Sequence, residues 1–160
     1  MVTKQWAERY AHTLAAFDQA LEEGQQIAAG RALLDRALAD GGAGSGPYVI
    51  QAAIASLQAE EQLDWPQIAI LYSTLADRTG SPVVRLNRAV AVAEADGPAA
   101  ALAIVDQLDL PDYQYWHSTR AELLRRLGRR AEARAEYQRA LDLARTAPER
   151  RFLQRRIAES

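Results

Sequence analysis

The feature that most constrains the fold is a helix-turn-helix unit that recurs three times along the chain. The turns inside the three units lie near Asp64, Gly97 and Arg129, so the spacing is 33 and then 32 residues. Small or apolar residues stand at matching distances from each turn, where two helices would pack closely. These aligned residues are Ser56, Ala89 and Ala121 before the turns, and Ile68, Ala101, Ala133, Tyr72, Val105, Tyr137, Leu75, Leu108 and Ala140 after them.

The repeat predicts a tetratricopeptide-like (TPR-like) array, whose usual period is about 34 residues. We expect an all-α protein, a right-handed superhelix of antiparallel helix pairs with about eight or nine helices in a single domain. Three repeats are predicted at about 46–80, 81–111 and 112–147, after a degenerate helix pair at 1–45 and before a capping helix at 148–160. Such arrays bind other molecules on extended surfaces, but their period does not identify the ligand.

Prolines mark the predicted helix starts, because a first helical turn tolerates the missing N–H. Asp64 with Gln67, and Thr146 with Glu149, have the spacing of a capping box. The predicted helices therefore open near Pro47, Pro66, Pro82, Pro98, Pro111 and Glu149, the first running to about Glu61, the fifth to about Gly128 and the last to about Ala158.

The upstream region matches the repeat poorly. Residues 6–23 and 25–40 are predicted to be helical, and the sequence leaves open whether Gly24 separates them or one longer helix runs through. The glycine-rich stretch 41–46 is interpreted as a flexible loop within the domain, because it is too short for a domain boundary. It also lacks the Lys-Ser/Thr pair of a phosphate-binding loop.

Composition excludes several classes of protein. The chain has no cysteine, so it has no disulfide, zinc–thiolate site or cysteine nucleophile. No apolar run approaches the roughly 20 residues that a membrane span needs, and the polar N-terminus does not read as a signal peptide. A cytoplasmic protein that does not contact a membrane is therefore expected.

Charge is distributed unevenly. Residues 1–119 hold 7 Lys/Arg against 15 Asp/Glu, a net −8, whereas residues 120–160 hold 12 Arg against 6 acids, a net +6. A basic end can meet nucleic acid or an acidic protein surface. A solvated helical face of alternating Glu and Arg is the simpler interpretation. The aromatic residues of this end, Tyr137 and Phe152, fall on expected core positions rather than on a stacking surface.

The residue pattern does not predict an enzyme, a metal site or a cofactor. His12 and His117 are about a hundred residues apart and do not form a helical metal-ligand pair. We predict that His117 is partly buried and hydrogen-bonded, with a ligand contact as the alternative. Glu60 and Glu61 are adjacent on a helix, so their side chains diverge by about 100° and do not form a catalytic pair.

A partner is expected on the first helices of the pairs, which line the concave face of such arrays. Asn87 with Arg88 is the most interesting pair, since an amide and a guanidinium together can hold a backbone or a carboxylate. A structural role for that pair is equally open. The candidate partner-binding residues are Gln51, Glu60, Asn87, Arg88, Glu94, Tyr115, His117, Glu122 and Arg125.

Several ordered motifs also resemble one protein family. They are GPYVIQAAIA at 46–55, DWPQI at 64–68, SPVVRLNRAVA at 81–91, DGPAAAL at 96–102, HSTRAELLRRLGR at 117–129 and ERRFL at 149–153. Together they resemble the C-terminal TPR-like extension of a subclass of bacterial extracytoplasmic-function (ECF) RNA polymerase sigma factors. The resemblance covers about residues 25–160, and residues 1–24 depart from it.

The resemblance implies a function in transcription regulation. In that family the extension regulates the sigma factor through intramolecular or partner contacts, and residues 1–45 cannot hold the promoter-melting and promoter-reading domains. The chain would then be either an excised extension or a freestanding relative of it. Its implied partners are sigma-factor domains, RNA polymerase or a signalling protein, without direct nucleic acid contact. The alternative is a freestanding TPR scaffold or small-ligand sensor unrelated to sigma activity, with homo-oligomerisation left open.

Overall fold

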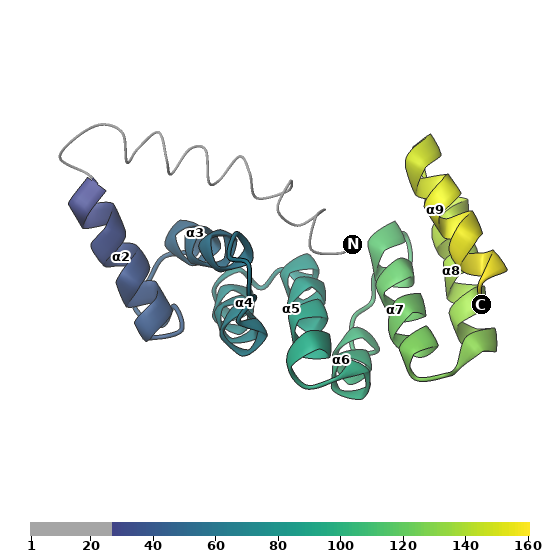
Figure 1. The fold of residues 1–160 in the computed structure, drawn as a ribbon, viewed down its shortest axis with the longest axis horizontal. Coiled ribbons are helices and arrows are strands. Elements are labelled where there is room, and N and C mark those ends of the chain that lie inside the picture. Colours follow the sequence, from purple (N-terminus) through teal and green to yellow (C-terminus); the bar gives the residue numbers. More distant parts are fainter. Residues whose placement is uncertain (1–26) are drawn as a thin grey trace. The chain divides into compact units, whose positions relative to one another are not determined.

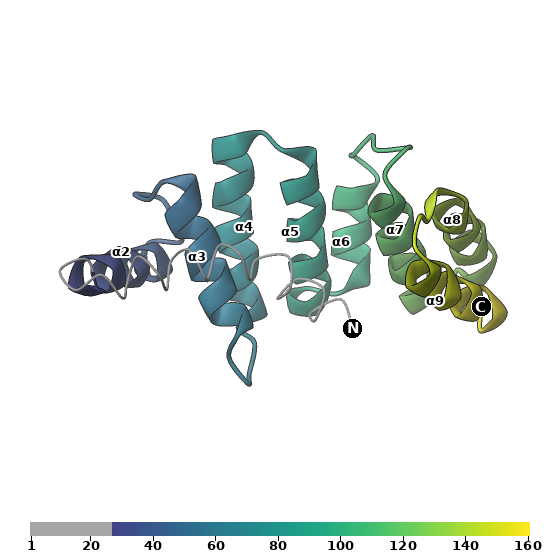
Figure 2. The same cartoon turned by 90° about the horizontal axis from the view of Figure 1, so that it is seen from above.

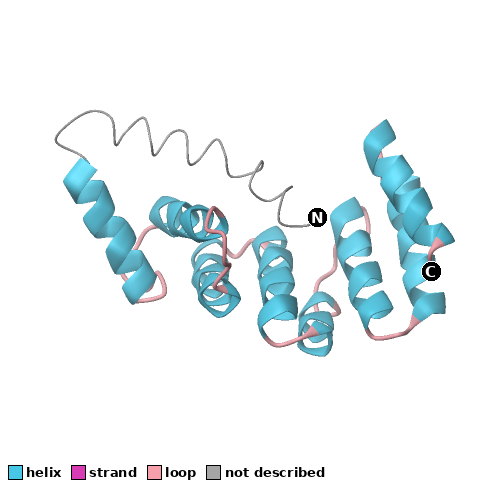
Figure 3. Cartoon of the chain, viewed as in Figure 1, coloured by secondary structure: helices cyan, strands magenta, loops and turns pink. Residues whose placement is uncertain are grey.

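The structure is a computed structural model that describes residues 27–160. In that range it is all-α, with eight helices and no strand (Figures 1 and 3). The chain forms two compact units, and the boundary between them lies between Val84 and Arg85. The predicted helix at 6–23, the question of a break at Gly24, and His12 lie outside the described residues.

The first unit contains three helices, α2 (Ile27–Ala39), α3 (Pro47–Gln58) and α4 (Trp65–Thr79). α2 packs on α3, and α3 packs on α4, as the two views in Figures 1 and 2 also show. α3 ends three residues before the predicted Glu61. The core between α3 and α4 consists of fully buried aliphatic and aromatic side chains: Ile50, Ile54, Ile68, Leu71, Tyr72 and Leu75.

The glycine-rich loop before α3 is anchored, so the prediction that it is flexible was wrong. Gly41 and Gly42 have φ values of 62° and 83°, in the left-handed region that favours glycine. The carbonyl of Gly41 accepts a hydrogen bond from the Thr74 hydroxyl, and that of Ala43 accepts one from the Arg78 guanidinium. Both donors belong to α4, which therefore holds the loop.

The second unit contains most of α5 (Pro82–Ala95), followed by α6 (Pro98–Val105), α7 (Gln114–Arg126), α8 (Arg130–Leu143) and α9 (Ala147–Ala158). The last four pack in sequence order, α6 on α7, α7 on α8 and α8 on α9. Their largest fully buried side chains are Val105, Leu124, Tyr137 and Leu153.

Almost all of the residues aligned in the predicted repeat are buried. Every aligned residue after the three turns is buried, including Tyr72, Val105 and Tyr137 at the same repeat position. Before the turns, Ala89 and Ala121 are fully buried, whereas Ser56 is half-buried. The recurring small and apolar residues therefore form the packed side of each helix.

Prolines occupy the first turn of α3, α4, α5, α6 and α9, as predicted. The exception is Pro111, since α7 begins three residues later at Gln114. The Thr146–Glu149 capping box is confirmed in both directions. The Asp64 cap forms only in one direction, because Gln67 donates its side-chain amide to the carbonyl of Leu38 at 2.8 Å instead.

Within residues 27–160, none of the helices combines the length and the apolar character needed to cross a membrane.

Candidate functional site

Most of the predicted partner-binding residues fall in the second unit. Gln51 is half-buried on α3 and Glu60 is exposed beyond the end of that helix, both in the first unit. On α5, Asn87 is buried, Arg88 is half-buried, and Glu94 pairs with Arg126 of α7 at 2.7 Å. Asn87 and Arg88 therefore do not form a jointly accessible pair, and burial favours a structural role for Asn87.

Two predicted residues on α7, Tyr115 and Glu122, connect that helix to α9 and α8, and a third, Arg125, pairs with Glu122. The Tyr115 hydroxyl donates to the Glu149 carboxylate of α9 at 2.9 Å. Arg125 donates two hydrogen bonds to Glu122, at 3.0 and 2.6 Å, in the bidentate geometry that arginine favours with carboxylates. The Tyr137 hydroxyl of α8 donates to the same carboxylate at 2.7 Å. These side chains are half-buried, except Tyr137, which is buried.

Opposing effects act on the pKa of Glu122. Burial of the carboxyl disfavours its charged form, but hydrogen bonds from Arg125 and Tyr137 outweigh that effect, so the Glu122 pKa is lowered. For Tyr137, burial and the hydrogen bond to the Glu122 carboxylate both raise the pKa. The pair is therefore held as a carboxylate with a neutral phenol.

Two residues of α9 complete this surface and were not among the sequence candidates. The Arg156 guanidinium lies 5.4 Å from the centre of the Phe152 ring, within cation–π range. Both are half-buried, and Arg156 is close enough to Glu122 and Tyr137 to affect their pKa values. We define the α7–α9 face as Tyr115, Glu122, Arg125, Glu149, Phe152 and Arg156. The i,i+4 spacing of Phe152 and Arg156 is a sequence signal that would have found this pair.

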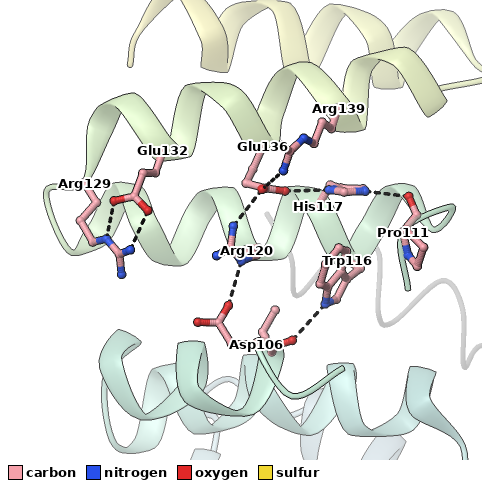
Figure 4. Close-up of polar contacts among 10 residues, drawn as sticks. Asp106, Pro111, Trp116, His117, Arg120, Arg129, Glu132, Glu136 and Arg139 are labelled. Atoms are coloured by element: carbon pink, nitrogen blue, oxygen red, sulfur yellow. Dashed lines mark hydrogen bonds and ion pairs between the residues drawn. The ribbon is translucent and has the colours of Figure 1, made fainter. Parts of the chain in front are cut away.

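A second polar group lies inside the unit, centred on Glu136 of α8 (Figure 4). Only 3% of Glu136 is exposed. Burying an ionisable group costs desolvation free energy, so the stability of this arrangement depends on the hydrogen-bond partners of the carboxylate. Its carboxylate accepts from His117 Nδ1 at 2.7 Å, from Arg120 at 2.8 Å and from Arg139 at 2.5 Å. The two α7 side chains, His117 and Arg120, point toward it from the facing helix.

The prediction that His117 is buried and hydrogen-bonded is confirmed. Its Nε2 faces the carbonyl oxygen of Pro111 at 2.8 Å, while Nδ1 faces Glu136. Neither ring nitrogen is available as a general base or metal ligand in this arrangement. Residues 27–160 also lack any group of three or more His, Cys, Asp or Glu side chains placed to hold a metal ion.

The same network fixes the segment between α6 and α7. Arg120 Nε donates to Asp106 at 2.8 Å, and the Trp116 indole N–H donates to the carbonyl of Val105 at 3.1 Å. With the His117–Pro111 contact, the first two turns of α7 hold the connecting segment at three points. The Pro111 carbonyl, one of these three points, lies three residues before α7 begins.

Comparison with known proteins finds a relative of this chain. A protein of Rhizobium meliloti (strain 1021), described only as uncharacterized, is 48% identical over 118 residues. The match covers 70% of this chain but 28% of the relative, so the chain spans less than a third of that protein's length. No protein-family model and no solved structure matches the chain.

Proposed function

We propose that this chain is a regulatory protein-interaction module of the kind found as a TPR-like C-terminal extension of ECF RNA polymerase sigma factors. In this proposal its helices stack as antiparallel pairs in a right-handed superhelix, and it modulates transcription initiation through protein contacts. The observation that carries the proposal is the burial of matching positions in the three predicted repeats, represented by Tyr72, Val105 and Tyr137.

Three of the motifs behind the resemblance supply helix starts or residues of the α7–α9 face. GPYVI begins α3, DWPQI supplies the cap and first turn of α4, and ERRFL holds the Glu149 and Phe152 of the α7–α9 face. Similarity to a limited part of a longer protein is compatible with a module that acts beside other domains.

We further propose the α7–α9 face as the partner-binding surface. It combines an aromatic ring with arginines, the residue types enriched in the energetically important centres of interfaces. Its side chains are half-buried and fixed by Tyr115–Glu149 and Glu122–Arg125 contacts. Binding would therefore order few additional side chains, which lowers the entropic cost of association.

The proposal is tested by adding the chain to a transcription assay. The sigma factor is one whose own extension carries the same motifs and has been deleted. We expect the added chain to change promoter-specific transcript yield, and a variant with both Phe152→Ala and Arg156→Ala to lose most of that change. Gln154→Ala, an exposed substitution on the same helix, is the matched control. Unchanged transcription together with undetectable binding to the sigma domains would contradict the proposal.

The same chain distinguishes the alternative function. A small-ligand sensor would show a raised melting temperature with one metabolite, because a ligand that binds the folded state stabilises it. That result, without any effect on transcription, would favour a freestanding sensor over a sigma-factor module.

A further inference from the structure

The C-terminal region has more arginine than its own acids can neutralise. Residues 120–160 contain twelve arginines and six acidic residues. All six acids are already engaged inside the second unit by hydrogen bonds or ion pairs. Glu122 accepts from Arg125, Glu132 from Arg129, Glu136 from three cations, Asp142 from Gln138, Glu149 from Tyr115 and Thr146, and Glu159 from Arg156.

Five arginines of this region have no hydrogen-bond or ion-pair partner within residues 27–160. All five are exposed, and four of them form two i,i+4 pairs, one on α8 and one on α9. The sequence interpretation of a face on which Glu and Arg alternate and neutralise each other therefore does not describe these positions. The five are Arg130, Arg134, Arg145, Arg151 and Arg155.

We propose that each of these two pairs, Arg130 with Arg134 on α8 and Arg151 with Arg155 on α9, can dock an acidic helical segment of a protein partner, and we call the four residues together the arginine surface. Residues four apart on a helix have Cβ atoms roughly 5–6 Å apart on one face. A partner helix with carboxylates four apart presents the same spacing. Arginine binds carboxylates bidentately, so such a match is geometric as well as electrostatic.

Charge elsewhere in the chain favours a protein over nucleic acid as the partner. Residues 1–119 carry a net −8, so the chain as a whole is not the strongly basic protein that binding to a long polyanion favours. Nucleic acid surfaces that bind single strands also use exposed stacking aromatics. On α8 and α9 the aromatic residues are Tyr137, which is buried, and Phe152, which is half-buried.

The inference rests on the proposed function only in taking the partner to be a protein, and its test does not use transcription. Fluorescence anisotropy of the full chain would measure binding of a labelled alanine-based peptide of about 20 residues, long enough to form a helix. The peptide carries glutamate pairs at i,i+4. A second peptide of the same composition places its glutamates on opposite helical faces, and a labelled DNA duplex is the third probe.

The variants are R130Q/R134Q and R151Q/R155Q. The matched control, R36Q/R85Q, removes the same charge from two exposed arginines that lack partners in the described chain. We expect each test pair to weaken binding of the i,i+4 peptide about three- to ten-fold and the control to change it less than two-fold. We also expect the wild-type chain to prefer the i,i+4 peptide over its isomer, with affinity falling as salt rises.

Three results would overturn the inference: equal loss in the control and the test pairs, equal binding of the two peptides, or tighter binding of the duplex with the same dependence on the four arginines. Circular dichroism melting of each variant separates lost binding from lost folding. A failed peptide assay with an intact effect on transcription would reject the arginine surface and leave the proposed function standing.

Discussion

At the scale of single residues, the buried Glu136 carboxylate of the second unit accepts hydrogen bonds from three side chains, so its removal should destabilise the unit. Glu136→Ala leaves His117 and Arg120 facing each other without their shared acceptor. Removing a buried acceptor leaves the buried donor that faced it unsatisfied, which costs about 1–3 kcal/mol. We expect a loss of this size in the free energy of unfolding from urea titrations.

Glu132→Ala is the matched control for that prediction. Glu132 lies on the same helix and pairs with Arg129, but its side chain is 51% exposed. Exposed ion pairs contribute roughly 0–1 kcal/mol. Equal destabilisation by the two substitutions would show that Glu136 is not the centre of a buried network.

The lowered pKa of Glu122 predicts an acid-sensitive contribution to stability. Its folded-state pKa lies below the ordinary 4.5, so the folded state binds this proton less tightly than the unfolded state does. The contribution is therefore present above about pH 4.5 and is lost as pH falls through the folded-state value. In chemical denaturation between about pH 6 and pH 3, Glu122→Gln should lose stability less steeply than the wild type. Parallel curves would contradict the assignment.

For the polar contacts of His117 and Tyr137, the sequence predicted these two residues but not the groups that they contact. His117 was predicted to be hydrogen-bonded, but its acceptors, Glu136 and the Pro111 carbonyl, depend on how α7 rotates against α8 and where α7 begins. Tyr137 was predicted as core from its repeat position, whereas its bond to Glu122 follows from the same packing. The pattern of residue types along a helix predicts which side chains are buried. It does not predict which side chain of the neighbouring helix each one will contact.

At the scale of elements, the repeat register makes a quantitative prediction for α4. Tyr72→Ala or Leu75→Ala removes a fully buried side chain, so each should cost roughly 2–5 kcal/mol through lost burial and cavity formation. Ile70→Ala is the matched control, since Ile70 lies on the same helix but is 55% exposed. Thermal melting of the three variants checks the register, and wild-type behaviour of Tyr72→Ala would contradict it.

Element boundaries were predictable where a local rule decides them. Prolines and caps placed the starts of α3, α4, α5, α6 and α9 because first-turn chemistry is local. The start of α7 was missed because the Pro111 carbonyl is used by a side chain six residues later. The anchored loop before α3 was missed for a similar reason, since its two donors come from α4.

At the scale of the whole molecule, the two compact units predict local rather than uniform responses to damage. Native proteins open locally in cooperative units, and each of the two compact units has buried side chains of its own. Leu75→Ala should therefore speed amide hydrogen exchange in α3 and α4 while α8 keeps its wild-type protection. Hydrogen-exchange mass spectrometry resolves these segments. Equal acceleration in α8 would show that the chain unfolds as one cooperative body.

The all-α class and the buried positions of the helices followed from periodicity, because buried residues recur with the period of the helix. The charge asymmetry was also visible in sequence, but not which arginines remain unpaired. Glu132 and Arg129 neutralise each other, whereas Arg130 and Arg134 on the same helix have no partner in the described chain. That difference depends on side-chain reach and on neighbouring helices.

Trp116 gives the second unit a built-in optical probe. Its indole ring lies edge-on to the His117 imidazole, with ring centres 4.8 Å apart, and its N–H is bonded to the carbonyl of Val105. Indole emission responds to the polarity and to the quenching groups around the ring. A substitution or a bound partner that loosens α7 from the end of α6 should therefore change the emission wavelength or the emission intensity of Trp116 fluorescence. No added label is needed.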